Sequence, residues 1–365
     1  MRRVSWRWVP VAVVLALLCA LPSLAGALLP VSDSHLSPGQ LLARIRGSDR
    51  VGWSGYAEAR GSLALPAVKE LGDLPALFGG VTRMRGWWRG PTQWRVDTLA
   101  LNAEDDASRD ARGSWLWQSA DRRATRIDGV LDIRLPAPPD LLPAVLGRRL
   151  AGSADVQLSS LAPRRVAGRS AQGVRLVPRD GARTTVGAVD IWADGPTGLP
   201  LRVDVSPKGR GPSLTSVQLE LDLGPPAAAL ASFRPPAGAD VRETEAPDVA
   251  ALVDRFAPFR LPPRLAGLQR SDRIRPLQGG GVATYGDGLT SFAVLPLPRD
   301  IARRIIRGLA STGDGTRGVA LTPLVSAVVA RADRRAYLLA GSVPAAVLDA
   351  ALAELAAAPP LLRHA

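Results

Sequence analysis

Residues 192–205, WADGPTGLPLRVDV, have the pattern of a β-hairpin and decide the fold class. A strand ends at Ala193, glycine and proline provide a turn, and the next residues alternate between apolar and polar side chains. Because successive side chains of a strand point to opposite faces, Arg202 and Asp204 share one face, while Trp192 falls on the polar side before the turn. We expect the interior to be lined by the aliphatic row, which consists of Val189, Ile191, Leu199, Leu201, Val203 and Val205.

The same period-two texture fills most of the chain before residue 240. It is seen in GWSGYAEARGSLALP, VTRMRGWWRGPTQWRVDTLAL and RGSWLWQSADRRATRI. One predicted helix, capped by Ser37, precedes the strands, and a second at residues 138–150 interrupts them. The proline- and charge-rich residues 233–248 then mark a boundary. The sequence therefore predicts a first domain at residues 36–240 and a small α+β domain at residues 248–358, with helices near 248–256, 300–309 and at its end.

The chain of 365 residues has a formal net charge of +13 and a pI of about 11.2. Lys69 and Lys208 are the only lysines, and heavy use of Ala, Arg, Gly and Pro indicates a GC-rich genome. Because codon bias then explains much of the arginine, we predict no nucleic-acid partner. A basic surface is still compatible with anionic lipid. The single cysteine, Cys19, excludes an intramolecular disulfide.

An apolar run at residues 9–31 follows the basic start MRRVSWRWVP. Positive charge before such a run keeps the amino end inside the cell and sends the body of the protein outside. The site Ala25-Gly26-Ala27 favours a cleaved signal peptide, whereas the length of the run suits a membrane anchor. Both interpretations of residues 1–31 predict an extracytoplasmic protein, secreted or anchored to the outer face of the cytoplasmic membrane. Leu18 before Cys19 argues against a lipid-attachment site.

Residues for common catalytic sites are scarce. His35 and His364 are the only histidines, which argues against a Ser-His-Asp or Cys-His site and leaves zinc without ligands. GDGTRG, residues 313–318, fits Gly-x-Gly-x-x-Gly by letter, but it follows a predicted helix and precedes strands, as a plain loop does. The acidic run Glu104-Asp105-Asp106 matches no calcium-loop spacing, and we predict a solvated hairpin tip there. We predict no catalytic residue, no metal and no cofactor.

Tryptophans are the most informative residues of the early strands. Alternation gives one surface that combines large aromatic side chains with very small ones. Two interpretations remain: an ordinary core, in which small residues fit against large ones, or a cavity with aromatic walls that holds an acyl chain. Trp87 is an exception, because it falls among arginines on the other face. The candidate cavity-lining residues are Trp53, Met84, Trp88, Trp94, Val96, Trp115, Trp117, Ile191, Leu201 and Val203.

Four motifs in a fixed order resemble the LolA-like superfamily of lipoprotein carriers, and within it the two-domain RseB/MucB type. They are GWSGYAEARGSLALP, WRGPTQWRVDTL, DIWADGPTGLPLRVDV and FRPPAGADV, and the second unit is similar to the small carboxy-terminal domain of that type. The resemblance implies an α+β protein with an unclosed antiparallel β-barrel, a half-barrel, wrapped over helices around an apolar interior. Members carry lipoproteins, bind acyl chains or lipid fragments, or bind an anti-sigma factor at the membrane, and the resemblance implies no catalytic residues.

Three functions are compatible with these observations. The first is an exported or membrane-tethered carrier or sensor that binds a lipid or lipoprotein acyl chain in the half-barrel. The second is a regulator that binds an extracytoplasmic anti-sigma factor or another membrane protein. The third is an enzyme with paired carboxylates, which stays open because its two acids can lie far apart in a chain, although no sequence feature supports it.

Overall fold

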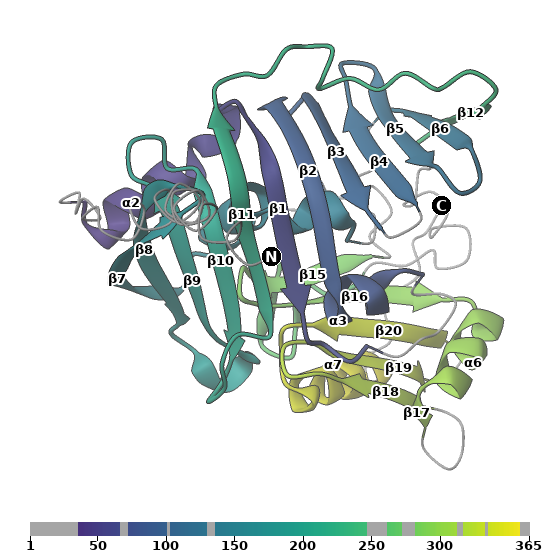
Figure 1. Ribbon diagram of the computed structural model, residues 1–365. Coiled ribbons are helices and arrows are strands. Elements are labelled where there is room, and N and C mark those ends of the chain that lie inside the picture. Colours follow the sequence, from purple (N-terminus) through teal and green to yellow (C-terminus); the bar gives the residue numbers. More distant parts are fainter. Residues whose placement is uncertain are drawn as a thin grey trace, which may run out of the picture.

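The computed structural model describes residues 36–65, 72–100, 103–129, 136–246, 261–271, 282–311, 317–332 and 335–357. The predicted apolar run at residues 9–31, the predicted helix at residues 248–256 and most of GDGTRG lie outside these ranges. Within them, no helix combines the length and the apolar character needed to cross a membrane. The described residues form two β-sheets, one large and one small (Figure 1).

The first unit is built on an open sheet of 12 strands. They are β1 (Trp53–Gly61), β2 (Val81–Gly90), β3 (Gln93–Leu99), β4 (Glu104–Arg109), β5 (Gly113–Gln118), β6 (Arg123–Asp128), β7 (Val156–Val166), β8 (Arg169–Pro178), β9 (Val186–Asp194), β10 (Pro200–Pro207), β11 (Leu214–Leu223) and β12 (Asp240–Glu245). The order is β12-β6-β5-β4-β3-β2-β1-β11-β10-β9-β8-β7, and all neighbours are antiparallel except β12 and β6. The predicted unclosed half-barrel is confirmed, and β12 extends the sheet past residue 240, the predicted end of the first domain.

Helices and 3-10 turns complete the first unit. They are α2 (Pro38–Arg46), η2 (Ser48–Arg50), α3 (Leu74–Gly79), η4 (Pro138–Leu141), α4 (Pro143–Ala151) and η5 (Gly181–Arg183). The predicted cap of α2 is confirmed: the Ser37 side chain accepts a hydrogen bond from Gln40 N, and the Gln40 side chain accepts one from Ser37 N. The helix predicted at residues 138–150 is present as η4 followed by α4.

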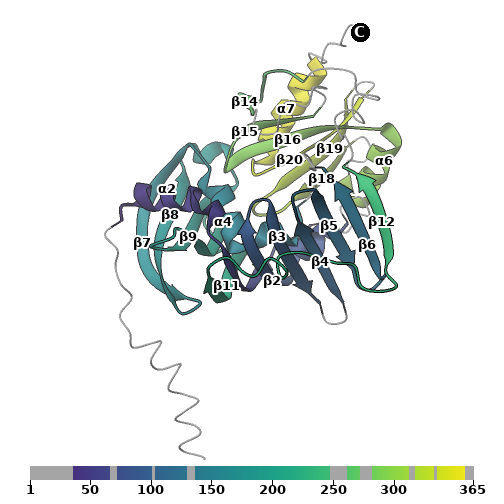
Figure 2. The same cartoon turned by 90° about the horizontal axis from the view of Figure 1, so that it is seen from above.

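The hydrophobic core lies between the inner face of the sheet and the helices α2 and α4. Leu41, Leu42 and Ile45 of α2 are buried in it. Figure 2 shows α2 beside β7 and β8, and α4 packs on β10. Gly147 permits this close approach, because a Cβ atom there would lie 2.6 Å from Pro200 Cβ.

The hairpin of residues 192–205 forms between β9 and β10, as predicted. Ile191 pairs with Val203, and both are fully buried in the core, which confirms the inward-facing aliphatic row. Trp192 lies on the opposite face, as the alternation indicates. It is nevertheless buried, because β7 covers it: its Nε1 donates to Ala162 O at 3.0 Å, and the Arg164 guanidinium lies 4.2 Å from its ring centroid.

The turn of this hairpin packs against α2. The Asp194 carboxylate accepts hydrogen bonds from Thr197 N at 3.1 Å, from Thr197 Oγ1 at 2.6 Å and from Arg169 Nε at 2.7 Å. Gly198 has a φ of 71°, and a Cβ atom there would lie 2.5 Å from the carbonyl carbon of Arg44. The Arg44 side chain donates to a carbonyl of the turn at 2.7 Å. The motif Asp-Gly-Pro-Thr-Gly therefore joins the sheet to the first helix.

The second unit is a smaller antiparallel sheet with a helix on each face. Its strands, in the order β13-β14-β15-β16-β20-β19-β18-β17, are β13 (Arg264–Leu265), β14 (Leu268–Ser271), β15 (Ala283–Asp287), β16 (Thr290–Leu297), β17 (Ala310–Ser311), β18 (Arg317–Leu321), β19 (Ser326–Ala332) and β20 (Arg335–Gly341). α7 (Ala345–Ala357) packs with Val328 and Leu339, and α6 (Arg299–Gly308) packs on the other face with Val329 and Ala336. Both helices agree with the predictions of a helix near residues 300–309 and one at the end of the domain.

The two units meet at the loop that follows η5. Thr184 Oγ1 donates to Leu289 O at 2.6 Å. Thr185 Oγ1 donates to Leu324 O at 2.6 Å, and Thr185 N donates to Ser342 O at 3.0 Å. Leu289 and Leu324 of the second unit also join the hydrophobic core of the first unit. Hydrogen bonds and apolar contacts together hold the units at this junction.

Candidate functional site

The tryptophan cluster predicted from the early strands lies on the inner face of the first sheet. Trp53 pairs with Trp88 across β1 and β2, and Trp88 pairs with Trp94 across β2 and β3. The rings of Trp88 and Trp94 are stacked, with centroids 6.1 Å apart and an interplanar angle of 10°. The same face and the same core hold the candidates Met84, Val96, Ile191, Leu201 and Val203.

These inner side chains are closely packed. Trp53 is 1% exposed and Trp88 is 8% exposed, and the five aliphatic candidates are at most 1% exposed. Leu142, which lies between η4 and α4, covers the cluster. Gly86 leaves room for the Trp53 ring, since a Cβ atom there would lie 2.7 Å from Trp53 Cη2. An acyl chain would therefore enter this face only if the covering elements moved.

The indole N–H of Trp53 has no hydrogen-bond acceptor in the part of the chain that the structure describes. By contrast, Trp88 Nε1 donates to Asp49 O at 2.8 Å. A buried donor without a partner costs about 1–3 kcal/mol. A water molecule or a ligand oxygen next to Trp53 Nε1 would remove that cost.

Trp115 and Trp117 lie on the opposite face of the sheet and are not part of the inner cluster, so the structure does not bring all ten candidates together. Trp115 pairs with Ser108, and Ser108 pairs with Arg95, which lies on the face opposite the core. Both indole rings contact Phe233, at centroid distances of 5.8 and 5.9 Å. Alternation within β5 shows that the two tryptophans share a face, but the pairing through β4 decides which face it is.

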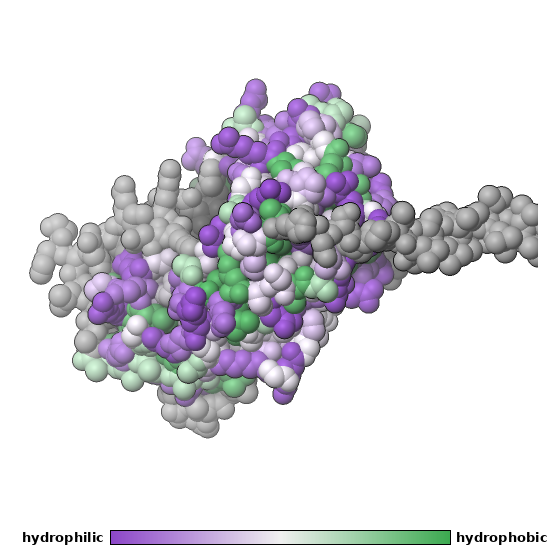
Figure 3. Space-filling model, turned by 90° about the vertical axis from the view of Figure 1, so that its left-hand side faces the viewer, coloured by the Kyte–Doolittle hydropathy of each residue, from purple (hydrophilic) through white to green (hydrophobic). Residues whose placement is uncertain are grey.

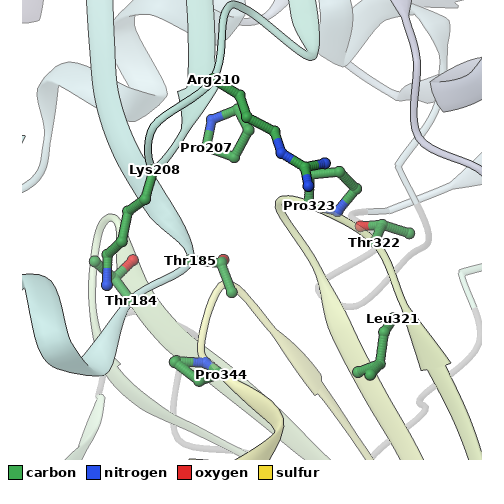
Figure 4. Close-up of a pocket in the computed structure, with 9 residues that line it drawn as sticks. All are labelled: Thr184, Thr185, Pro207, Lys208, Arg210, Leu321, Thr322, Pro323 and Pro344. Atoms are coloured by element: carbon green, nitrogen blue, oxygen red, sulfur yellow. The ribbon is translucent and has the colours of Figure 1, made fainter.

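A pocket of about 510 Å³ opens at the junction of the two units (Figure 4). It is lined by Thr184, Thr185, Pro207, Lys208 and Arg210 of the first unit and by Leu321, Thr322, Pro323 and Pro344 of the second. The sequence did not predict this pocket, because its residues come from loops and strand ends that are far apart in the chain. The only local signal is the composition of these loops, which are rich in proline, threonine and glycine.

The pocket combines positive charge with apolar surface. Lys208 and Arg210 are exposed, and none of the nine lining residues is acidic. The hydroxyls of Thr185 and Thr322 already donate to backbone carbonyls, at 2.6 and 3.0 Å. Leu321 is 60% exposed at the pocket wall, which is high for a leucine. The available contacts are therefore cationic and aliphatic.

Large apolar side chains elsewhere on the described surface are dispersed. On the face shown in Figure 3, the green areas are small and purple areas separate them. The other exposed large apolar residues are Val81, Leu99, Leu116, Leu219, Leu230 and Val241, and they come from several elements of the first unit. The junction pocket is therefore a more specific candidate for partner contact than the general surface.

The acidic run Glu104-Asp105-Asp106 opens β4. Glu104 and Asp105 are exposed, as predicted for a solvated hairpin tip, but Asp106 is buried, so the prediction is wrong for this third residue. Pairing of β4 with β3 and β5 buries alternate side chains, and Asp106 is 6% exposed. Carboxylate oxygens of Asp97, Glu104 and Asp106 lie within 4.8 Å of one another. Arg95 Nη2 lies 2.9 Å from Asp106 and 3.0 Å from Asp97. The guanidinium thus supplies the positive charge that a cation would otherwise bring.

The pKa values of Asp97 and Asp106 in this cluster are raised. Burial raises the pKa of Asp97 to about 7, and the neighbouring Asp106 carboxylate adds to the rise. Burial also raises the pKa of Asp106, while Arg95 acts against the rise on both groups. Asp97 therefore keeps its proton close to neutral pH in the folded chain, whereas an unfolded aspartate loses it near pH 4.

Folding stability is expected to fall as the pH rises from about 4 to about 7. The raised pKa of Asp97 makes the folded chain bind more protons than the unfolded chain in this window, so the contribution is complete below about pH 4 and lost through about pH 7. Asp97→Asn, which cannot ionise, should flatten the slope, as measured by urea unfolding across that range. Asp128→Asn, at a half-exposed carboxylate, is the control. An unchanged slope in Asp97→Asn would contradict the assignment.

Comparisons with known proteins agree with this architecture. Residues 133–225 match the family model of the MucB/RseB N-terminal domain. The MucA/MucB complex of Pseudomonas aeruginosa has 20% identity and a TM-score of 0.50, covering 86% of this chain and 95% of that chain. A structure of MucB in complex with MucA(peri) has 20% identity and a TM-score of 0.51, with coverages of 87% and 97%.

A LolA superfamily protein, NE2245 from Nitrosomonas europaea, matches with 12% identity and a TM-score of 0.24, covering 54% of this chain and 98% of that chain. No curated protein matches the sequence significantly. At these identities, the two MucB matches show a shared fold and leave the ligand and partner of this chain to be argued from its own residues.

Proposed function

We propose that this chain, which has the LolA-like, two-domain RseB/MucB-type architecture, is a non-enzymatic binding protein that works outside the cytoplasm. Its main task is to bind a segment of a membrane protein, such as an anti-sigma factor, between its two units. The junction pocket is the observation that carries this proposal, because both units build it and it offers exposed positive charge beside exposed aliphatic surface.

The chemistry of the pocket favours an acidic partner segment with an apolar side chain. Lys208 and Arg210 complement carboxylates, and Leu321 offers aliphatic contact. A pocket of about 510 Å³ is within the range of about 300–1,000 Å³ that holds small ligands or a few side chains. The architecture supports the same function, since two solved MucB structures that share it are complexes with MucA. The expected partner is thus an extracytoplasmic segment of a membrane protein.

The double substitution Lys208→Glu with Arg210→Glu is expected to weaken partner binding at least about tenfold, because it places like charges opposite the acidic segment. The full chain and the variant would be used for affinity capture from host membranes at low salt, with the captured proteins identified by mass spectrometry. Arg112→Glu with Arg234→Glu reverses the same charge on exposed residues outside the pocket and serves as the control. This function would be contradicted if the full chain captured no stoichiometric membrane protein. It would also be contradicted if the pocket variant and the control variant captured the same amount of partner.

Lipid binding is a second candidate function, in which the inner face of the half-barrel holds a lipid or lipoprotein acyl chain. It is supported by the apolar wall of Trp53, Trp88 and Trp94. The unsatisfied indole N–H of Trp53 also supports it, because it could donate a hydrogen bond to an ester carbonyl. Native mass spectrometry after gentle extraction tests it. If no hydrophobic ligand co-purifies and no acyl probe binds with micromolar affinity, the inner face is an ordinary core.

A further inference from the structure

Helix α6, RDIARRIIRG, divides its residues between a buried apolar side and an exposed basic side. Ala302, Ile305 and Ile306 are at most 8% exposed and form a small core with Val329 and Ala336 of the sheet beneath. The opposite side is formed by the exposed residues Arg299, Arg303, Arg304 and Arg307. The helix is therefore fixed on the second unit by its apolar side and presents its arginines outward.

The arginines of α6 follow one another along the helix surface. Arg299, Arg303 and Arg307 are spaced by four residues, so their side chains are neighbours of like charge, which destabilises a helix. Asp300 provides the acidic group within α6, and it lies 3.4 Å from Arg304. Arg331, also exposed, extends from the same sheet face as Val329, because the two are two residues apart in β19. The four arginines of α6 and Arg331 thus form a basic cluster, to which α6 itself contributes a single acidic group, Asp300.

We propose that this basic cluster docks the protein onto a membrane surface that contains anionic phospholipid. Because the apolar side of α6 is already buried, the helix has no free apolar face to insert, and contact is limited to the lipid headgroups. Guanidinium groups suit this role, since they bind phosphate oxygens in pairs. Each arginine near an anionic surface strengthens binding about fivefold.

The docking surface differs from the sites described above. α6 packs on the face of the second sheet opposite α7, and Pro344 of the junction pocket precedes α7. In both Figure 1 and Figure 2, α6 lies at the opposite end of the molecule from α2, which is the first described helix. Contact through α6 therefore uses a different face of the second sheet from the one that α7 covers.

The experiment uses the full chain, reconstituted in vesicles of phosphatidylcholine with or without phosphatidylglycerol, and measures hydrogen exchange at the amides of α6. Exchange is expected to slow at least about fivefold when phosphatidylglycerol is present, while the amides of α7 remain unchanged. Raising the salt from about 0.01 M to about 1 M shortens the Debye length from about 30 Å to about 3 Å and should abolish the effect. Equal exchange in both kinds of vesicle overturns the proposal.

The variant Arg303→Gln with Arg307→Gln should lose most of the phosphatidylglycerol-dependent protection, because it removes two charges and leaves the buried side of α6 unchanged. Arg112→Gln with Arg234→Gln has the same net charge and should keep the protection. If both variants behave alike, overall charge and not α6 is responsible, and the proposal fails. It also fails if soluble glycerol phosphate protects α6 as well as the vesicles do, since a free anion is then sufficient.

Discussion

Replacing Trp53 by alanine is expected to lower the free energy of unfolding by about 3–5 kcal/mol. Trp53 is the largest side chain of the inner cluster with almost no exposure, 1%, and it is packed over Gly86, which Leu142 also covers. Removal of the ring would leave a cavity. Because β1 is hydrogen-bonded to β2 on one side and to β11 on the other, it cannot readily move to close that cavity. Urea or thermal unfolding of the full chain measures the loss.

The matched control for Trp53→Ala is Trp117→Ala. Trp117 lies on the other face of the same sheet, is only partly buried and contacts Phe233 at 5.9 Å, so its loss should cost about 1–2 kcal/mol. Equal effects of the two substitutions would show that the inner face is not the main core. If Trp53→Ala instead left stability intact and reduced acyl-probe binding, the inner face would be a ligand cavity rather than packed core.

Replacing Gly198 by alanine is expected to destabilise the fold by about 2–4 kcal/mol. Its φ of 71° is unfavourable for a residue with a Cβ atom, and that atom would meet the backbone of α2, 2.5 Å from Arg44 C. Backbone cannot move aside as a flexible side chain can, so the turn would have to separate from the helix. Unfolding experiments give the total cost, and hydrogen exchange at α2 should report the loosened contact.

Gly168→Ala separates the two causes of this effect. Gly168 also has a positive φ, 74°, but no atom lies within 4 Å of the position of a Cβ atom there. Its replacement should cost only the conformational part, about 1–2 kcal/mol. If Gly198→Ala and Gly168→Ala cost the same, contact between the hairpin turn and α2 contributes nothing to stability.

Local patterns predicted the elements on which the site is built. Ser37 marked the start of α2, and glycine and proline marked the turn between β9 and β10. These signals depend on capping groups and on residues that fix the backbone of a turn, and such groups act over a few residues. They are therefore present in the sequence itself.

The faces of single strands were also predictable, but their place in the sheet was not. Trp88 and Trp94 were assigned to one face and Trp87 to the other, and the stacked inner pair agrees with this. Trp115 and Trp117 were assigned to the inner surface, although pairing through β4 puts them outside. The same limit explains the acidic run in β4, which looked solvated until its neighbouring strands buried Asp106.

By itself, then, the sequence determined the predominance of strands in the first unit, the helix starts, the turns and the inward aliphatic row of Ile191 and Val203, since each follows from patterns among residues close in the chain. Only the tertiary structure decided three further features: the outer position of Trp115 and Trp117, the Arg95-centred acid cluster and the pocket between Lys208 and Leu321. These depend on strand register and on the docking of two units. In each of them, residues that are far apart in the sequence come into contact, and a local sequence pattern cannot predict such a contact.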